Sequence, residues 1–286
     1  MKSKVKRTTA NEANRFYFES FDGNDEAKQL LTTIKTSLEI LPEEVSLKFF
    51  SRDEQLAYWL NLYNVTLLTE LVDIYPEKNL KKVLTGENSI LSKKLLTVAG
   101  VPLSLNDIQF NILKNNYDHN PLVIYGLYQG IIGGPNIRRK AYTGEDVWRA
   151  LKNNAIEFVN SNRGTYGSSK NASVFQVSSM YDRSGSYFPD FNSDLASHLK
   201  EYLQGDELAM LEKATMLKPN IDDWTITSLA GNYREFGGSL ADNKAALLDS
   251  ARSTLVNTNE GPGGATLAAS IGYRSQAVQA KTLSVN

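Results

Sequence analysis

Residues Asp53 to Pro76, which read DEQLAYWLNLYNVTLLTELVDIYP, decide the fold of this chain. Their apolar side chains occur on all sides of a helix axis, which predicts a buried central helix rather than a surface helix. Ser51 and Glu54 stand at the spacing of a capping box, so we expect the helix to begin there. Because proline cannot continue a helix interior, we expect it to end at Pro76.

Two amides, Asn61 and Asn64, interrupt this apolar run. Positions three apart share one face of a helix. A buried amide without hydrogen-bond partners costs about 1–3 kcal/mol, so both side chains need partners. We favour a structural interpretation, in which the amides hold neighbouring loops through hydrogen bonds to backbone. The other interpretation is that they line a ligand site, and both can hold at once.

The composition is that of a globular protein and excludes several kinds of site. The chain has 286 residues with 41% hydrophobic and 10% aromatic side chains, enough for one large domain or two small ones. It contains no cysteine and two histidines, His119 and His198. Disulfides, thiolate zinc sites and a cysteine nucleophile are therefore excluded, and a multi-histidine metal site is not expected. We expect no metal and no cofactor.

The charge balance gives no sign of a polyanionic partner. Lys plus Arg number 31 against 32 acids, so no overall field draws the protein to nucleic acid or to an anionic membrane. No apolar run approaches the length of a membrane span, and no hydrophobic segment follows the basic N-terminus. Cytoplasmic location and a periplasmic or secreted location after signal cleavage both stay open.

Periodicity predicts an α+β fold: a helix-rich single domain around a small β-sheet. Helices are expected from Asn24 to Pro42, from Ser104 to Lys114, from Gly144 to Asn160, from Asn192 to Leu203 and from Glu207 to Leu217, a hairpin from Lys94 to Val101, and strands from Pro121 to Tyr128 and from Val174 to Val177. We divide the chain into an N-terminal extension (1–23), a main domain (24–236) and a Gly/Ala/Ser-rich C-terminal appendage (237–286).

The loop that follows the expected strand, Gln129 to Pro135, is rich in glycine. Backbone N–H groups at Gly133 and Gly134 could cradle an anion, with Arg138 close enough to add charge-assisted hydrogen bonds. The loop matches neither a Walker motif nor a dinucleotide fingerprint. The glycines can equally serve a structural turn with positive φ or close packing. Gln129 is the last polar side chain before them.

Several segments in order resemble the family catalogued as domain of unknown function 547. Tyr58 to Asn64 looks like its signature Phe-Trp-Ile-Asn-Leu-Tyr-Asn, and Leu103 to Ile108 resembles Leu-Ser-Leu-Asp-Asp-Ile. Tyr187 to Phe191 and the pair Asp223-Trp224 are similar to two later motifs. The resemblance extends over roughly residues 24–232 and implies the family's fold, but it implies no settled reaction.

The chain departs from this family where thiol and imidazole groups are usual. Phe110 and Ile124 stand where the family usually has histidines, and Gly134 stands in place of its cysteine. Thiol chemistry therefore cannot be carried over to this chain.

We expect a non-catalytic or altered-site member that binds a small or anionic ligand, or a protein partner. The expected cleft lies between the central helix and the Gly-rich loop, with Asn61, Asn64, Gln129, Gly133, Gly134 and Arg138 as ligand-binding residues. The alternative is a hydrolase or transferase that uses Asp107, Asp223 or a Ser or Tyr hydroxyl in the same cleft. Such an enzyme would need a group whose pKa is shifted toward neutrality.

Overall fold

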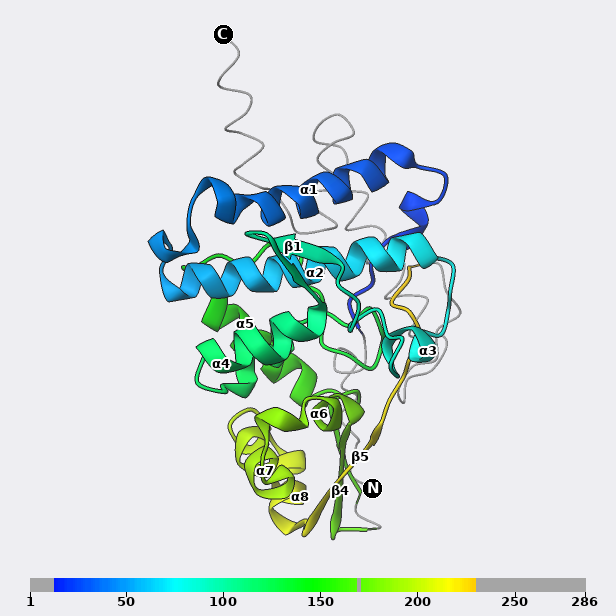
Figure 1. Ribbon diagram of the computed structural model, residues 1–286. Helices are drawn as coiled ribbons and strands as arrows, with labels where there is room; N and C mark the ends of the chain where they lie inside the picture. Colours follow the sequence, from blue (N-terminus) through cyan, green and yellow to red (C-terminus); the bar gives the residue numbers. More distant parts are fainter. Residues whose placement is uncertain (1–12, 169–170, 230–286) are drawn as a thin grey trace, which may run out of the picture.

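The computed structural model describes residues 13–168 and 171–229 of the chain (Figure 1). Over these residues the fold is α+β and rich in helix, as the sequence predicts, with two small sheets. The expected C-terminal appendage, 237–286, and the first 12 residues of the expected N-terminal extension lie outside the described residues.

Helices make up most of the described structure. The α-helices are α1 (Asp25–Glu44), α2 (Arg52–Ile74), α3 (Lys81–Leu84), α4 (Lys114–Asn116), α5 (Val147–Val159), α6 (Ser179–Arg183), α7 (Phe191–Lys200) and α8 (Asp206–Lys213). The 3-10 helices are η1 (Phe18–Phe21), η2 (Leu47–Phe49), η4 (Pro121–Gly126) and η5 (Gly185–Tyr187), and η3 (Asp107–Leu113) is a π-helix. In Figure 1, α1 lies over α2, and α6, α7 and α8 form the lower part of the molecule.

The strands form two separate sheets. Strands β1 (Leu96–Val98) and β2 (Val101–Leu103) make an antiparallel hairpin. Strands β3 (Thr165–Gly167), β4 (Val174–Ser178) and β5 (Met216–Ile221) make the second sheet, in which β4 is central, antiparallel to β3 and parallel to β5. The hairpin turns at Ala99 and Gly100, both with positive φ, where the sequence predicts it.

Helix α2 is the buried helix that its sequence predicts. The capping box is formed: Glu54 N–H donates to Ser51 Oγ, and Ser51 N–H donates to Glu54 Oε2 at 2.8 Å. Leu60, Leu62 and Leu68, which point in different directions around the axis, are each fully buried. The helix is therefore surrounded by the rest of the domain. Loops that hydrogen-bond to its side chains are anchored to the core.

Helix α1 continues two residues beyond Pro42, where the sequence predicts its end. Because proline has no N–H, the carbonyl oxygen of Leu38 lacks its usual helical donor. The Tyr58 hydroxyl donates to that oxygen at 3.0 Å. The proline therefore opens a hydrogen-bonding position through which α2 contacts the last turns of α1.

The expected strand from Pro121 to Tyr128 is wrong, because residues 121–126 form the 3-10 helix η4. Asn120 caps its start by accepting from Leu122 N–H at 2.9 Å, and Pro121 occupies a first position where no donor is needed. The segment is as buried as expected. A short apolar run has no periodicity that separates a buried strand from a buried helical turn.

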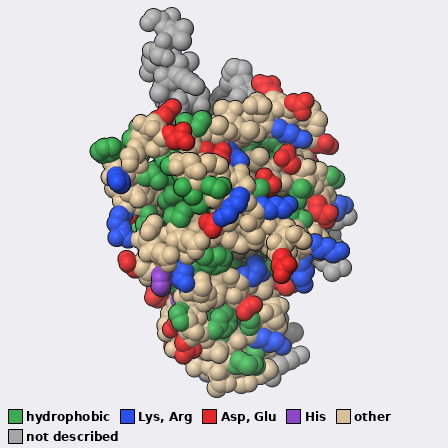
Figure 2. All heavy atoms as spheres, viewed as in Figure 1, with side chains coloured by type: hydrophobic (Ala, Val, Ile, Leu, Met, Phe, Trp, Pro, Cys, Tyr) green, Lys and Arg blue, Asp and Glu red, His purple; other side chains and the backbone are tan. Residues whose placement is uncertain are grey.

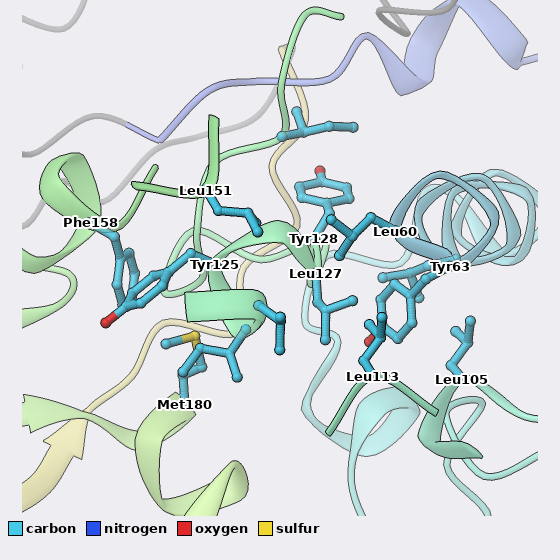
Figure 3. Packing of buried hydrophobic residues seen from close by; sticks show 14 of the residues in the cluster. Leu60, Tyr63, Leu105, Leu113, Tyr125, Leu127, Tyr128, Leu151, Phe158 and Met180 are labelled. Atoms are coloured by element: carbon cyan, nitrogen blue, oxygen red, sulfur yellow. The ribbon is translucent and has the colours of Figure 1, made fainter. Parts of the chain in front are cut away.

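Buried side chains from three parts of the chain meet around η4 (Figure 3). Leu127 and Tyr128 lie beside Leu60 of α2, and the Tyr125 ring lies against Phe158 of α5 with ring centroids 6.1 Å apart. The segment is therefore a packed centre of the domain rather than a surface connection.

Two further elements differ from the expected ones. The helix after Ser104 is capped as predicted, since Ser104 N–H donates to Asp107 Oδ2 at 2.7 Å, but it widens into the π-helix η3. The helix expected from Glu207 to Leu217 ends at Lys213, and β5 begins at Met216. Strand β5 depends on pairing with β4, some 40 residues earlier, and local periodicity does not contain that information.

The N-terminal phenylalanines pack into the core. Phe16, Phe18 and Phe21 are buried, and Phe16 N–H donates to the carbonyl of Thr227 at 2.7 Å. Residues near the two ends of the described chain are thereby joined.

His198 on α7 is a buried histidine. This side chain is only 6% exposed, its ring stacks on Tyr125, and its Nε2 lies 2.9 Å from the Tyr125 hydroxyl. The Tyr125 hydroxyl in turn lies 3.1 Å from that of Tyr181. Because burial disfavours the charged imidazolium, the pKa of His198 is lowered to about 4.

This buried histidine predicts a loss of stability in acid. Its folded-state pKa lies below the unfolded value of about 6.5, so the unfolded chain binds the proton more readily between pH 6.5 and 4. The stabilisation is complete above about pH 6.5 and falls as the pH drops. Urea unfolding should show that wild type loses about 2 kcal/mol more than His198→Gln between pH 7 and pH 4.5. Equal losses in the two proteins would contradict the assignment.

Candidate functional site

Asn61 and Asn64 of α2 are both hydrogen-bonded to backbone, which is the structural interpretation that the sequence favours. Asn61 Nδ2 donates to the carbonyl of Tyr142, and Tyr142 N–H donates to Asn61 Oδ1, both at 2.9 Å. Asn64 Nδ2 donates to the carbonyl of Gly126, and Tyr128 N–H donates to Asn64 Oδ1, again at 2.9 Å. Each amide therefore uses one donor and its acceptor to fix the chain that crosses α2. We name these four hydrogen bonds the amide clamps.

The hollow beside the amide clamps is too small for a ligand. Asn61, Asn64, Arg138 and Tyr142 line a space of about 10 Å³, which suits about one water molecule. Arg138 is held there by an ion pair with Asp146 at 3.1 Å and lies over the Tyr142 ring at 4.8 Å. The expected cleft between this helix face and Arg138 is therefore filled by the protein itself.

The glycine loop is built around its own backbone rather than around an anion. The N–H groups of Ile132, Gly133 and Gly134 donate to the carbonyls of Thr225, Asp223 and Ile131, at 2.9, 2.9 and 3.1 Å. The cradle expected at Gly133 and Gly134 therefore has its donors already in use.

Close packing explains why residues 133 and 134 are glycines. A Cβ at Gly133 would lie 2.6 Å from the backbone nitrogen of Asp223. The carbonyl of Gly134 accepts from Nη1 of the fully buried Arg163 at 2.7 Å. These contacts support the structural-turn interpretation of the loop.

A larger cavity lies on another side of α2. It has a volume of about 350 Å³, within the range of small-molecule sites. Its lining is Tyr63, Leu84, Thr85, Gly86, Ser89, Leu91, Ser92, Asn106, Gln109, Phe110, Gln129, Arg183, Ser184 and Trp224. We name it the Arg183 cavity. Of the six predicted site residues, Gln129 alone belongs to this lining.

Arg183, the last residue of α6, supplies the positive charge of this cavity. Its Nη2 donates to Gln129 Oε1 and its Nη1 donates to Ser179 Oγ, both at 2.8 Å. The guanidinium lies over the Trp224 ring at 4.5 Å from its centroid, a cation–π distance. Burial lowers the pKa of Arg183, although an arginine stays protonated at neutral pH. Arg183 is not among the site residues that the sequence predicts, because its short segment carries no periodic or spacing signal.

Neutral polar groups cover much of the remaining wall. Gln109 Nε2 donates to Ser184 Oγ at 3.3 Å, and Asn106 Nδ2 donates to Ser92 Oγ at 3.1 Å. Gln109 and Asn106 lie in or beside the π-helix η3, and π-helical turns are frequent at functional sites.

The carboxylates expected as catalytic groups are used elsewhere. Burial raises the pKa of Asp107, but hydrogen bonds from Lys94 and Ser104 outweigh it, so the pKa is well below its usual range. Lys94 Nζ lies 2.6 Å from Asp107 Oδ2. Asp223 Oδ1 accepts from Thr225 N–H at 2.9 Å. The described cavity lining contains no carboxylate and no imidazole.

The comparisons with known proteins agree with the resemblance of the sequence. Residues 47–159 match the family model described as "Protein of unknown function, DUF547". Over this segment the chain is similar to the DUF547 family. The segment includes the Tyr58 to Asn64 signature, the Leu103 to Ile108 motif and Gly134, whereas the two later motifs lie outside the match. No curated protein and no solved structure was found to match the chain.

The three positions at which the sequence departs from the resembled family pattern do not lie together in space. Phe110 lines the Arg183 cavity, whereas Ile124 is buried in η4. A Cβ at Gly134 would lie 3.1 Å from the Cβ of Gln129, so this position adjoins the cavity wall. Two of the three departures from the family pattern therefore fall in or next to the cavity.

Residues 13–168 and 171–229 contain no candidate metal site and no candidate membrane-spanning helix. No group of three or more His, Asp or Glu side chains is placed to hold a metal ion there. In that same part of the chain, every helix is too short or too polar to cross a bilayer. On the face shown in Figure 2, acidic and basic side chains are interspersed.

Removal of one amide clamp is expected to destabilise the protein strongly. Asn64→Ala leaves a buried carbonyl and a buried N–H without partners, at about 1–3 kcal/mol each. Asn61→Ala should cost less, because Asn61 is only half-buried and adjoins a water-sized space. Urea denaturation at pH 7 measures both losses. The assignment fails if Asn64→Ala is as stable as wild type or no less stable than Asn61→Ala.

A methyl group at position 133 is expected to break the contact between the glycine loop and Asp223. Gly133→Ala should cost about 1–3 kcal/mol, as overpacking does. Gly185→Ala is the matched control, because a Cβ there meets no atom within 4 Å and should leave the unfolding free energy almost unchanged. Thermal and urea unfolding of the two variants compare these effects, and equal stability would contradict the close-packing interpretation.

Proposed function

We propose that this protein binds a small anionic ligand in the Arg183 cavity. The observation that carries the proposal is the guanidinium of Arg183, partly buried in the wall of a cavity of about 350 Å³ without a carboxylate within 4 Å among the described residues. A desolvated cation is costly unless a counter-charge compensates it. Its two hydrogen-bond acceptors, Gln129 and Ser179, are neutral, and the carboxylates of Asp222 and Asp182 act on it only from beyond ion-pair distance. An anion in the cavity would supply a counter-charge in direct contact.

The composition of the wall also supports a binding site. Leu84, Leu91 and Phe110 provide apolar surface next to amides and hydroxyls, which is the usual mixture in small-molecule pockets. Trp224 is 9% exposed, and its indole N–H has no acceptor among the described residues. A protein partner presenting an anionic group is the other occupant consistent with this wall.

The alternative of a hydrolase or transferase has less support. General acid–base work needs a group that titrates near neutral pH. Among the described lining residues, the only phenol is that of Tyr63, and burial raises its pKa further from neutrality. In the part of the wall that the structure describes, the serine and threonine hydroxyls have no imidazole or carboxylate beside them as an activating base.

Ligand-induced stabilisation tests the proposal. At 100 times the dissociation constant, a bound anion adds about 2.7 kcal/mol to the unfolding free energy and raises Tm by several degrees. We expect at least one anion from a panel of sodium carboxylates, phosphate and sulfate, at ionic strength matched with chloride, to raise the Tm of wild type. Arg183→Met should abolish this rise.

The control for that experiment is Arg149→Met, which removes an arginine whose side chain is 76% exposed and distant from the cavity lining. It should respond to the same anions as wild type. The proposal is contradicted if no anion raises the Tm of wild type, or if Arg183→Met responds as fully as wild type.

A further inference from the structure

We infer that the ligand of the Arg183 cavity is a monocarboxylate with an apolar body, and that the side-chain oxygen of Gln129 occupies the place of one carboxylate oxygen until the ligand binds. This inference rests on the proposed function and narrows it to one class of anion and one specificity-determining residue.

The charge of the lining of the Arg183 cavity indicates that its ligand is a monoanion. Arg183 is the sole cationic residue of the described lining, and no lysine accompanies it. Backbone N–H groups on the opposite wall are already bonded: Ser89 N–H donates to Gly86, and Asn106 N–H donates to Leu91. A phosphate dianion usually needs several cations or a row of free N–H groups. One guanidinium balances one carboxylate.

The shape of the donors points the same way. The two terminal nitrogens of a guanidinium form a planar fork that matches the two oxygens of a carboxylate. In Arg183 this fork meets two oxygens, Gln129 Oε1 and Ser179 Oγ, each at 2.8 Å. Trp224 covers the guanidinium at 4.5 Å, so the plane of the fork is set by the protein. A ligand carboxylate can therefore take the position of the Gln129 oxygen without reorientation of the arginine.

Gln129 is the group best able to leave. It lies one residue beyond Tyr128, whose N–H is held by Asn64, so its backbone stays fixed while its side chain turns. Exchange of a neutral amide oxygen for a charged carboxylate oxygen strengthens the hydrogen bond to Arg183. Leu84, Leu91 and Phe110 then offer apolar surface to the remainder of the ligand.

Two substitutions of Gln129 should change carboxylate binding in opposite directions. Gln129→Glu places a tethered carboxylate on Arg183, which competes with the ligand and should weaken binding at least tenfold. Gln129→Met has a similar length but no acceptor, so it frees Nη2 of Arg183 and should bind at least as tightly as wild type. Unfolding curves establish whether each variant is folded. If one of the two variants does not fold, the other still tests the inference.

Calorimetric titration with three probes separates the classes of anion. Phenylacetate should bind wild type, with acetate at least tenfold weaker because it lacks the apolar body. Phenyl phosphate should bind at least tenfold more weakly than phenylacetate. A short peptide ending in phenylalanine, with a free or an amidated C-terminus, tells whether the carboxylate can also come from a chain end.

The possible results test the inference and the proposed function separately. Preference for phenyl phosphate, or unchanged phenylacetate binding by Gln129→Glu, overturns the inference but leaves the proposed anion site standing. Equal binding of acetate and phenylacetate overturns the apolar body. Failure of every anion in the Arg183-dependent Tm assay removes the proposed function itself.

Discussion

The fold depends on one constraint: a buried, irregular stretch of backbone must find hydrogen bonds without a sheet. Residues 121–128 are almost fully enclosed, and buried N–H and C=O groups that lack partners are costly. Helix α2 meets this need with the amide of Asn64, which accepts from Tyr128 and donates to Gly126. Asn154 of α5 donates to the carbonyl of Tyr125 at 2.7 Å. Side-chain amides thus supply the backbone hydrogen bonds that a neighbouring strand supplies in a β-sheet.

The same constraint positions the candidate site. Asn64 fixes the backbone of Tyr128, and the next residue, Gln129, reaches Arg183 on the far side of the cavity. Tyr63, the neighbour of Asn64 on α2, lines that cavity. Downstream, Asn61 fixes Tyr142, so the loop between the two clamps is held at both ends. The part of the cavity wall next to Gln129 is consequently anchored to the core helix α2.

The sequence was sufficient where local rules decide the structure. The capping box at Ser51, the burial of α2 and the turn at Ala99 and Gly100 all follow from residue spacing. It failed where partners distant in the chain decide, as in β5 and in η4, whose backbone is satisfied by Asn64 and Asn154. The sequence singled out Gln129 but not its hydrogen-bond partner Arg183, because no sequence pattern connects these two residues.

Phe110 and Gly134 stand where the resembled family pattern has a histidine and the cysteine, and they lie in or beside the Arg183 cavity. The position of Gln129 beside Arg183 depends on the amide clamps, which must protect the loop backbone from local opening as fully as the core backbone is protected. Native-state hydrogen exchange at the Tyr128 N–H tests this requirement most directly. We expect this N–H to exchange only through global unfolding, with the same opening free energy as core amides of α2 such as Leu67. Exchange at the rate of an unprotected loop amide would contradict the account.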